Sequence, residues 1–348
     1  MLKNVSLLIS EDRLSALVPQ FVIYAVQGSV TATVNFVIFA AIWRAEVLRC
    51  KKEYVIISAL ALTDALTGLA VISAGVGRNL MIVQGTANQL VSSLVCQFKP
   101  WNMILVVWDH TYGAMLATIS VDRLLMVCFP LFYLGLGQRY ALSVLGAVHL
   151  PYALLIGHHV HSLIKADLPA DKPQICYAPW MYPDKIYSHF VYTQSMVFAL
   201  LSIALYFFVV FVYKMQQSRV LLMLGEVEQQ FEMQRQQKLT VTMGFSSICT
   251  LCLHVIPLYG RQLIAYVDRT NEMTAMAVPL SAIMLNFNPM CNFALYWCRH
   301  RELRLGMQFM FRCKELTSMS LTQHHQPQVN RAETSRNLAQ DDLRLEDV

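Results

Sequence analysis

Long uncharged runs of residues alternate with short charged clusters along the whole chain. A helix needs about 20 consecutive apolar residues to cross a bilayer core of about 30 Å, because every backbone amide must find its partner inside the segment. Five runs without Asp, Glu, Lys or Arg meet this length: 14–43, 140–164, 186–213, 239–260 and 273–298. We predict that each is a transmembrane helix.

Two further runs have the same length but contain an acid. Residues 54–77 include Asp64, and residues 100–121 include Asp109 before the run ends at Asp122 and Arg123. A buried carboxylate costs about 2.5–3.5 kcal/mol on insertion scales, which the surrounding Leu, Ile, Val and Trp residues offset. The sequence therefore predicts an all-α membrane protein, a seven-transmembrane helix bundle over residues 18–298.

The basic residues predict the orientation of the bundle. With the N-terminus outside, most Lys and Arg residues near span ends fall on the cytoplasmic side, as is usual for membrane proteins. Residues 1–17 then form an extracellular tail. That tail holds the only Asn-x-Ser/Thr acceptor of the chain, so we expect a glycan on Asn4.

The chain after the seventh span changes character twice. Residues 299–313 combine basic residues with Leu303, Met307 and Met310 at helical spacing, which predicts an amphipathic helix in the cytoplasmic headgroup plane. Residues 314–348 are mainly polar, and we expect a disordered cytoplasmic tail.

Composition narrows the class of function. Of the residues, 56% are hydrophobic and 14% charged, well below the quarter or so that is usual in soluble domains, so lipid is the expected solvent. The net charge of +5 is not arranged as a basic face with interleaved aromatics, which argues against a nucleic-acid partner. The nine cysteines have no metal-site spacing, and we expect neither a metal nor a cofactor.

Two segments carry a family resemblance. ISVDRLLMVCFPLFY leaves the third span, and CNFALYWCRHREL joins the seventh span to the amphipathic helix. With these segments the chain resembles the rhodopsin-like G protein-coupled receptors over roughly residues 18–313, and among them the nematode serpentine chemoreceptors of class sx. The resemblance implies a multi-pass plasma-membrane receptor for an extracellular small molecule or peptide. It also implies a heterotrimeric G protein as partner, with kinases and arrestin at the C-terminal tail.

Asp122 and Arg123 match the family's Asp-Arg motif. A charged pair there can close the cytoplasmic mouth of the bundle and release Arg123 toward a partner when the helices separate. The simpler alternative is an arginine that anchors the span at the interface. The family's acidic partner at the start of the sixth span is replaced here by Gln237 and Lys238.

Polar residues within the spans match further family positions. Asn35, Asp64 and Asn288 are expected to meet near the bundle centre, since polar groups in hydrocarbon need one another. Such a network could switch or simply pack. Asn292 stands three residues after Pro289, where the family has a tyrosine, and Tyr112 replaces a small hydroxyl of the family's sodium site.

Pro257 interrupts the sixth run. A proline removes a backbone hydrogen bond and kinks a helix, so this position is a candidate hinge. The family's aromatic residue before this proline is absent from His254-Val255-Ile256-Pro257. His254 is either a polar substitute or a hydrogen-bonded core residue.

The cysteines fall into three groups by topology. Cys96 and Cys176 are the only two predicted on the oxidising side, and the resemblance implies a disulfide between them. Cys249 and Cys252 have CxxC spacing inside an apolar span and are interpreted as buried small residues. Cys313 ends the amphipathic helix and is either a palmitoylation site or a free thiol.

Asp109 is the leading candidate for ligand chemistry. It precedes Arg123 by 14 residues, about 21 Å along a helix, which places it below the outer mouth. It could bind a cationic group or pair with His110. The other residues expected to face an outer pocket are Trp101, Trp108, His158, His159, His161, Trp180 and Tyr259.

A secondary transporter that uses Asp64 and Asp109 for ion coupling is the main alternative. No pair of Gly/Pro-broken spans repeats between the two halves of the chain, which disfavours it. An intramembrane enzyme is a third class, but HEXXH and GxSxG motifs are absent.

Overall fold

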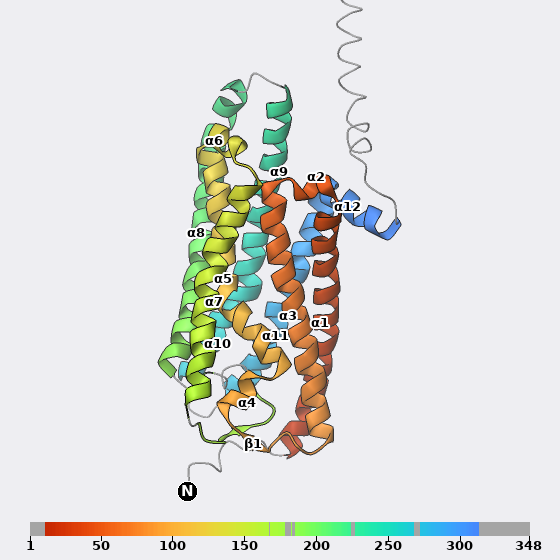
Figure 1. Ribbon diagram of the computed structural model, residues 1–348, viewed down its shortest axis with the longest axis vertical. Helices are drawn as coiled ribbons and strands as arrows, with labels where there is room; N and C mark the ends of the chain where they lie inside the picture. Colours follow the sequence, from red (N-terminus) through yellow and green to blue (C-terminus); the bar gives the residue numbers. More distant parts are fainter. Residues whose placement is uncertain are drawn as a thin grey trace, which may run out of the picture.

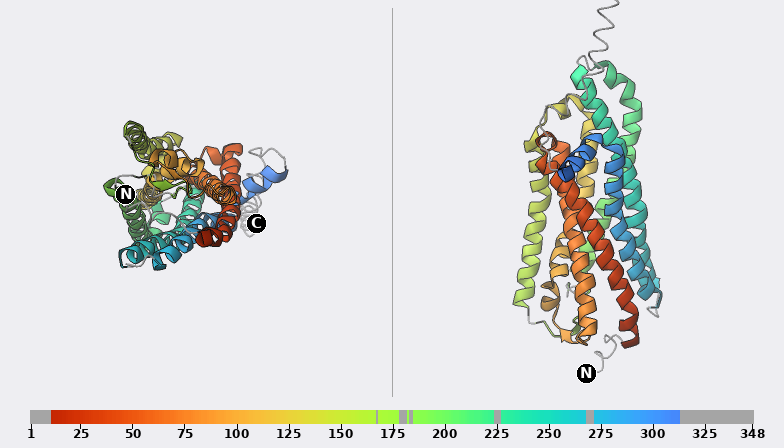
Figure 2. Two further views of the ribbon diagram at one scale, coloured as in Figure 1. Left: turned by 90° about the horizontal axis from the view of Figure 1, so that it is seen from below. Right: turned by 90° about the vertical axis from the view of Figure 1, so that its right-hand side faces the viewer.

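The fold is a bundle of long antiparallel helices (Figure 1). In the computed structural model of the protein, the described residues are 11–166, 168–177, 182, 185–223, 227–267 and 272–312. Seen along its axis, the bundle is a closed ring of helices (Figure 2). The prediction of an all-α seven-transmembrane bundle is confirmed.

Seven segments form the bundle, each around one of the predicted spans. They are α1 (Glu11–Arg44), α3 (Lys52–Val83), α5 (Pro100–Cys128), α7 (Gln138–Lys165), α8 (Lys185–Met223), the sixth helix made of α9 (Val227–Thr250), a π-helical turn (Leu251–Val255) and α10 (Ile256–Val267), and α11 (Glu272–Arg299). Six of these segments are long and apolar enough to cross a membrane by composition, on the residues that the structure describes. The seventh, α11, carries Asn286, Asn288 and Asn292, which lower its mean hydropathy.

Several helices extend beyond their predicted ends. The first helix begins at Glu11, inside the predicted tail. Glu11 and Asp12 lie in its first turn, where negative charges interact favourably with the positive end of the helix dipole. The third bundle helix continues to Cys128, so that Asp122 and Arg123 lie within a helix and not at its end. The fifth and sixth helices extend into the segment between them, to Met223 and from Val227.

Short elements close the two ends of the bundle. On the cytoplasmic end lie α2 (Glu46–Arg49), α6 (Pro130–Gly135) and α12 (Arg301–Arg312), and α12 lies beside the end of α1 and points away from the bundle (Figure 1). At the opposite end lie α4 (Ser93–Gln97) and a two-stranded antiparallel pair, β1 (Leu90–Val91) with β2 (Lys172–Pro173). The register pairs Leu90 with Pro173.

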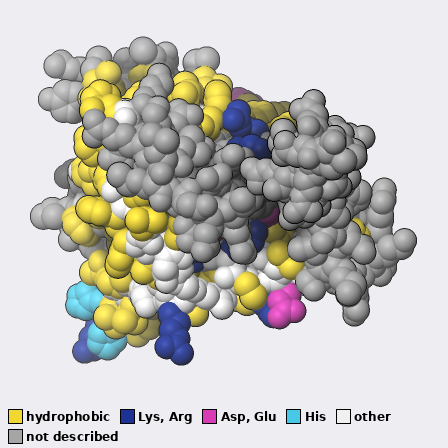
Figure 3. Space-filling view, turned by 90° about the horizontal axis from the view of Figure 1, so that it is seen from above, with side chains coloured by type: hydrophobic (Ala, Val, Ile, Leu, Met, Phe, Trp, Pro, Cys, Tyr) yellow, Lys and Arg dark blue, Asp and Glu magenta, His cyan; other side chains and the backbone are white. Residues whose placement is uncertain are grey.

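The amphipathic helix α12 packs as its pattern predicts. Leu303 and Met307 are fully buried and belong to the main core cluster with residues of α1 and α3. Seen from this end, Lys and Arg side chains lie at a few separate places among apolar side chains (Figure 3). Arg44, Arg49, Lys51 and Lys52 lie at this end of the helices, which agrees with a cytoplasmic face.

Close packing of α1 and α3 depends on small residues. A Cβ added at Gly68 would come within 2.5 Å of the backbone nitrogen of Ala32. A Cβ at Gly75 would meet the backbone carbonyl of Phe21. Backbone contact of this kind is typical of helix pairs in membranes. The hydrophobic effect does not drive two helices together in lipid, and small residues let the backbones approach closely enough to pack.

Candidate functional site

The cytoplasmic end of α5 carries a buried ion pair. Asp122 and Arg123 are each only 2% exposed. The Arg123 Nε atom donates to Asp122 Oδ2 at 2.9 Å, and Arg123 Nη2 also contacts Asp122 Oδ2. The predicted charged pair therefore forms, but it is enclosed by protein and does not snorkel to the interface.

Tyr133 on α6 completes this ion pair. Its hydroxyl accepts a hydrogen bond from Arg123 Nη2 at 2.7 Å and donates to the Asp122 carboxylate at 3.2 Å. Burial raises the pKa of the Tyr133 phenol far above its usual range, so the group stays neutral and keeps its proton to donate. In the family pattern the acidic partner of this arginine lies at the start of the sixth span, where this chain has Gln237 and Lys238. The structure places the partner in the loop helix after α5, and Lys238 is exposed.

Lys52, at the start of α3, holds α6 in place. Its Nζ atom donates to the backbone carbonyls of Tyr133 and Leu136, at 2.7 and 2.8 Å, and lies 4.1 Å from the centre of the Tyr133 ring. A cation at the carbonyl end of a helix is favourable. Lys52 thereby fixes the loop helix that fixes Arg123, a role that no sequence motif indicated.

The neighbouring Lys51 binds a different element. Its Nζ atom forms a 3.0 Å ion pair with Glu302 on α12, and the Tyr54 hydroxyl donates to the same carboxylate at 3.2 Å. Two consecutive lysines thus connect the start of α3 to α12 on one side and to α6 on the other.

The predicted polar core forms in part. Asn288 donates to the hydroxyl of Tyr112, and Tyr112 lies within electrostatic range of the buried Asp64. Asn35 donates to the Thr31 carbonyl of its own helix at 3.0 Å, instead of to Asp64 or Asn288. The Tyr112 ring occupies the space between α3 and α11 that a smaller hydroxyl residue would leave open. The polar side chains at the bundle centre therefore meet at this tyrosine.

Hydrogen bonds between polar side chains join the sixth helix to the seventh. Ser246 donates to Asn292 Oδ1 at 2.5 Å, and Thr250 donates to Asn288 Oδ1 at 3.3 Å. All four side chains are buried. Asn292, where the family pattern would have a tyrosine, is therefore a hydrogen-bonding residue of the helix pair.

The sixth helix changes its winding directly after Thr250, on the outer side of these bonds. Residues Leu251–Val255 form a π-helical turn, and Pro257 follows in the first turn of α10. A widened turn accommodates the proline ring and the backbone bond that proline removes. The buried His254 in this turn contacts Tyr112 in a tilted arrangement, with ring centres 4.8 Å apart. Pro289 lies buried in α11, next to Asn288.

A small cavity of about 20 Å³ lies beside the bonds between the sixth and seventh helices. Residues of α3, α5, α8 and α9 line it, and its polar lining consists of hydroxyl groups: Ser120, Ser202, Tyr206, Ser246, Ser247 and Thr250. A polar cavity of this size has room for about one water molecule.

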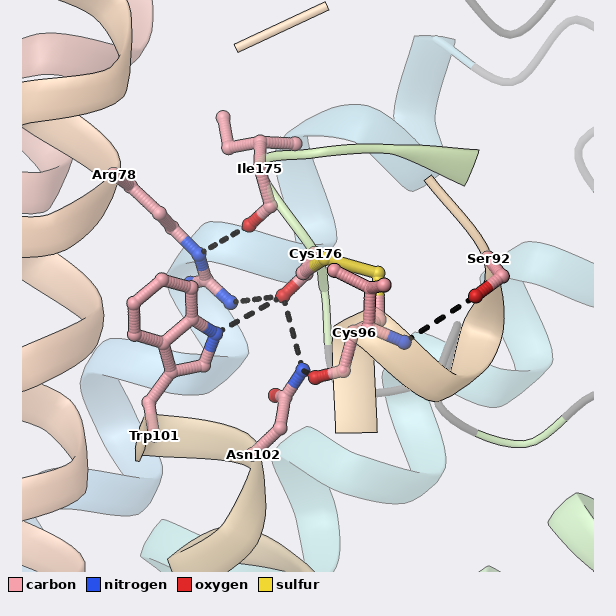
Figure 4. The surroundings of a disulfide bond; sticks show 8 residues. Arg78, Ser92, Cys96, Trp101, Asn102, Ile175 and Cys176 are labelled. Atoms are coloured by element: carbon pink, nitrogen blue, oxygen red, sulfur yellow. Dashed lines mark hydrogen bonds between the residues drawn. A yellow bond between two sulfur atoms is a disulfide. The ribbon is translucent and has the colours of Figure 1, made fainter. Parts of the chain in front are cut away.

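A disulfide joins Cys96 to Cys176 at the opposite end of the bundle, with a Cα–Cα distance of 5.2 Å (Figure 4). The predicted pairing is confirmed. Both cysteines are fully buried, and Cys176 has a positive φ of 45°. A structural disulfide belongs on the oxidising side of a membrane. Arg123 therefore lies at the cytoplasmic end.

The disulfide at one end, the Asp122–Arg123 pair at the other end and the polar residues between them are consistent with one known family. Residues 34–296 match the family described as 7 transmembrane receptor (rhodopsin family), and the match covers more than half of the chain. The protein belongs to the rhodopsin family of seven-transmembrane receptors. No curated protein matches the sequence.

The outer pocket expected of this rhodopsin-family receptor is only partly described. Trp101 is 3% exposed, and its indole donates to the Cys176 carbonyl at 3.1 Å. Tyr259 does not face the bundle as expected, because its side chain is 57% exposed. The π-helical turn before it adds a residue to the winding and rotates the following side chains.

Other predicted site residues lie outside the described part of the chain. The structure does not describe Asn4, Trp180 and Cys313, or the side chains of Trp108 and Asp109. Next to Asp109, His110 is buried, and its Nδ1 atom is 2.6 Å from the Val106 carbonyl.

Histidines and tyrosines form an aromatic cluster in the outer half of the receptor. The ring of His159 lies 5.2 Å from that of Tyr182, and the His110 ring lies 6.4 Å from the same tyrosine. His159 is buried, whereas its neighbours His158 and His161 are exposed. Of the histidines in α7 that could face the bundle interior, His159 is the one that packs there.

Proposed function

We propose that the protein is a plasma-membrane receptor that binds an extracellular small molecule or peptide and activates a heterotrimeric G protein. Membership of the rhodopsin family supports a receptor function and argues against an enzyme. The observation that carries the coupling proposal is the enclosure of Arg123 by Asp122 and Tyr133 at the cytoplasmic end.

The enclosed arginine corresponds to an inactive conformation. Buried charges are stable only when they are paired and hydrogen-bonded, and Asp122 of α5 and Tyr133 of α6 form hydrogen bonds with Arg123. If α6 releases Tyr133, the guanidinium loses its neutral partner and becomes available to a protein that enters from the cytoplasm.

The sixth helix is the proposed moving part. Buried hydrogen bonds from Ser246 to Asn292 and from Thr250 to Asn288 join it to the polar face of α11, and the small hydroxyl-lined cavity lies beside them. The π-helical turn and Pro257 form a hinge on the outer side of these bonds. A ligand that binds better to the conformation with the bonds broken shifts the population toward it.

The remaining parts of the proposal concern the cell. A chemosensory or neuromodulatory role follows from the resemblance to serpentine chemoreceptors. Kinases and arrestin are proposed partners of residues 314–348, and Asn4 and Cys313 are proposed sites of glycosylation and palmitoylation.

A ligand screen tests this function. Cells that express the chain with promiscuous G proteins are exposed to small molecules and peptides, and second-messenger release is recorded. The matched control is Arg123→Ala, expected at the surface in similar amount but without signal. Uptake of a labelled solute without G protein activation would favour the transporter alternative and overturn the proposal.

A further inference from the structure

Arg78 is a buried cation near the outer end of α3. Its side chain is 5% exposed, and among the described residues no ion pair includes it. Its Nε atom donates to the Ile175 carbonyl at 3.1 Å, and its Nη2 atom donates to the Cys176 carbonyl at 3.0 Å. Both acceptors are neutral.

Aromatic rings surround the guanidinium of Arg78. Its central carbon lies 4.8 Å from the ring centre of Tyr177 and 5.6 Å from those of Phe21 and Trp101. Burial raises the pKa of the Tyr177 phenol, so this group does not supply a negative charge. Cation–π contacts stabilise the arginine in part, but they leave its charge uncompensated.

The Cys176 carbonyl receives more donors than it can satisfy well. Arg78, the Trp101 indole at 3.1 Å and the Asn102 amide at 3.4 Å all point toward this oxygen, as Figure 4 shows. The Asn102 amide also donates to the Cys96 carbonyl at 2.8 Å. A carbonyl oxygen has two lone pairs, whereas a carboxylate has about four acceptor sites and a charge. Three N–H donors, one of them a cation, therefore converge on one neutral oxygen.

We propose that Arg78, Trp101 and Asn102 form the binding site for a carboxylate of the extracellular ligand, and that the Cys176 carbonyl occupies this site when no ligand is bound. The proposal rests on the proposed receptor function, and it names the chemical class of the ligand. The shared chemistry is that of a free organic acid or of a peptide C-terminus.

A carboxylate suits this site better than the carbonyl does. It can accept two parallel hydrogen bonds from the planar guanidinium, and such charge-assisted bonds are about twice as strong as neutral ones. It also compensates a charge whose burial is costly when unpaired. Because the site lies under the loop that carries Cys176, the carbonyl must move aside when the acid enters.

That movement has a direct route to the third bundle helix. Cys176 is covalently bonded to Cys96, which lies just before the start of α5. The same helix carries Asp122 and Arg123 at its other end. Displacement of the Cys176 carbonyl is therefore coupled to the helix that closes the cytoplasmic mouth.

The test measures thermal unfolding of the receptor in lipid nanodiscs by intrinsic fluorescence. The probes are sodium hexanoate and sodium benzoate at millimolar concentration, each compared with its methyl ester, and an N-acetylated dipeptide acid compared with its amide. The acids are expected to raise the Tm of the wild type, whereas the neutral analogues do not. The size of the dipeptide shift relative to the simple acids tells a peptide terminus from a free acid.

Variants assign the effect to the site. Arg78→Gln is expected to lose the acid-induced shift, Arg78→Lys to retain a smaller one, and the exposed cytoplasmic Arg49→Gln to match the wild type. If Arg78→Gln does not fold, Trp101→Phe keeps the cation and should need several-fold more acid for the same shift. The proposal is overturned if acids and neutral analogues act alike, if no acid stabilises the wild type, or if Arg78→Gln responds fully. The measurement needs no G protein, so its failure is distinct from failure of signalling.

Discussion

Ser246 on the sixth helix donates a 2.5 Å hydrogen bond to Asn292 on the seventh, and both side chains are buried. Because this bond joins the proposed moving helix to its neighbour, Ser246→Ala should favour separation of the two helices. We expect a several-fold rise in ligand-independent nucleotide exchange and a loss of about 1–3 kcal/mol of stability.

Ser247→Ala is the matched control for this bond. The Ser247 hydroxyl lines the same cavity, but it donates to the Met243 carbonyl of its own helix at 3.0 Å. Basal exchange should stay at the wild-type level in this variant. Equal activation by the two substitutions would mean that the bond to Asn292 does not restrain the helix.

Lys51 and Lys52 should affect different elements when each is replaced by glutamine. Lys52→Gln removes a buried cation from two carbonyls of α6, and we expect a loss of about 1.5–3 kcal/mol and faster amide hydrogen exchange over residues 130–136. Lys51→Gln removes a partly exposed ion pair worth about 0.2–1 kcal/mol and should accelerate exchange in the first turn of α12. Hydrogen exchange by mass spectrometry distinguishes the two patterns. Exchange that rises over the same residues in both variants would refute this division.

Gly68→Ala tests the backbone contact between α1 and α3. The added methyl would collide with the Ala32 backbone, so we expect a loss of about 1–3 kcal/mol. Gly146→Ala in α7 is the control, because nothing lies within 4 Å of its added Cβ, and it should gain about 0.5–1 kcal/mol from the better helix former. The midpoints of thermal unfolding in nanodiscs compare the two. Equal changes at the two positions would show that the contact with Ala32 does not set the result.

The spans were predictable because lipid imposes a simple rule on length and charge. Runs of about 20 residues without charges located five helices, and the two acid-bearing runs also formed helices. Helix ends were less predictable: Glu11, Cys128 and Met223 extend helices beyond the hydrocarbon, where water tolerates polar residues and apolar counting gives no signal.

The site residues that belong to a recognisable sequence motif were predictable. Cys96 with Cys176, and Asp122 with Arg123, were singled out and are paired in the structure. Tyr133 was missed because its contact with Arg123 depends on how a short loop helix folds back. Such a contact spans ten residues and has no periodic signature.

Some pairings depend on three-dimensional register alone. Cys249 and Cys252 were interpreted as buried, yet Cys252 is exposed, and the Cys249 thiol contacts that of Cys291 on α11. Lys52 reaches carbonyls more than eighty residues further along the chain. Backbone carbonyls carry no identity in a sequence, so neither a pattern nor a motif could have indicated these acceptors.

Nucleotide exchange by Tyr133→Phe tests the central claim most directly. This variant keeps the buried ring and removes the hydroxyl that bridges Asp122 and Arg123. In nanodiscs with purified heterotrimeric G proteins, we expect it to exceed the wild type several-fold in basal exchange, while the exposed-tyrosine control Tyr259→Phe equals the wild type and the Tyr133→Phe, Arg123→Ala double variant is silent. Exchange at or below the wild-type level in a folded Tyr133→Phe protein would contradict the account.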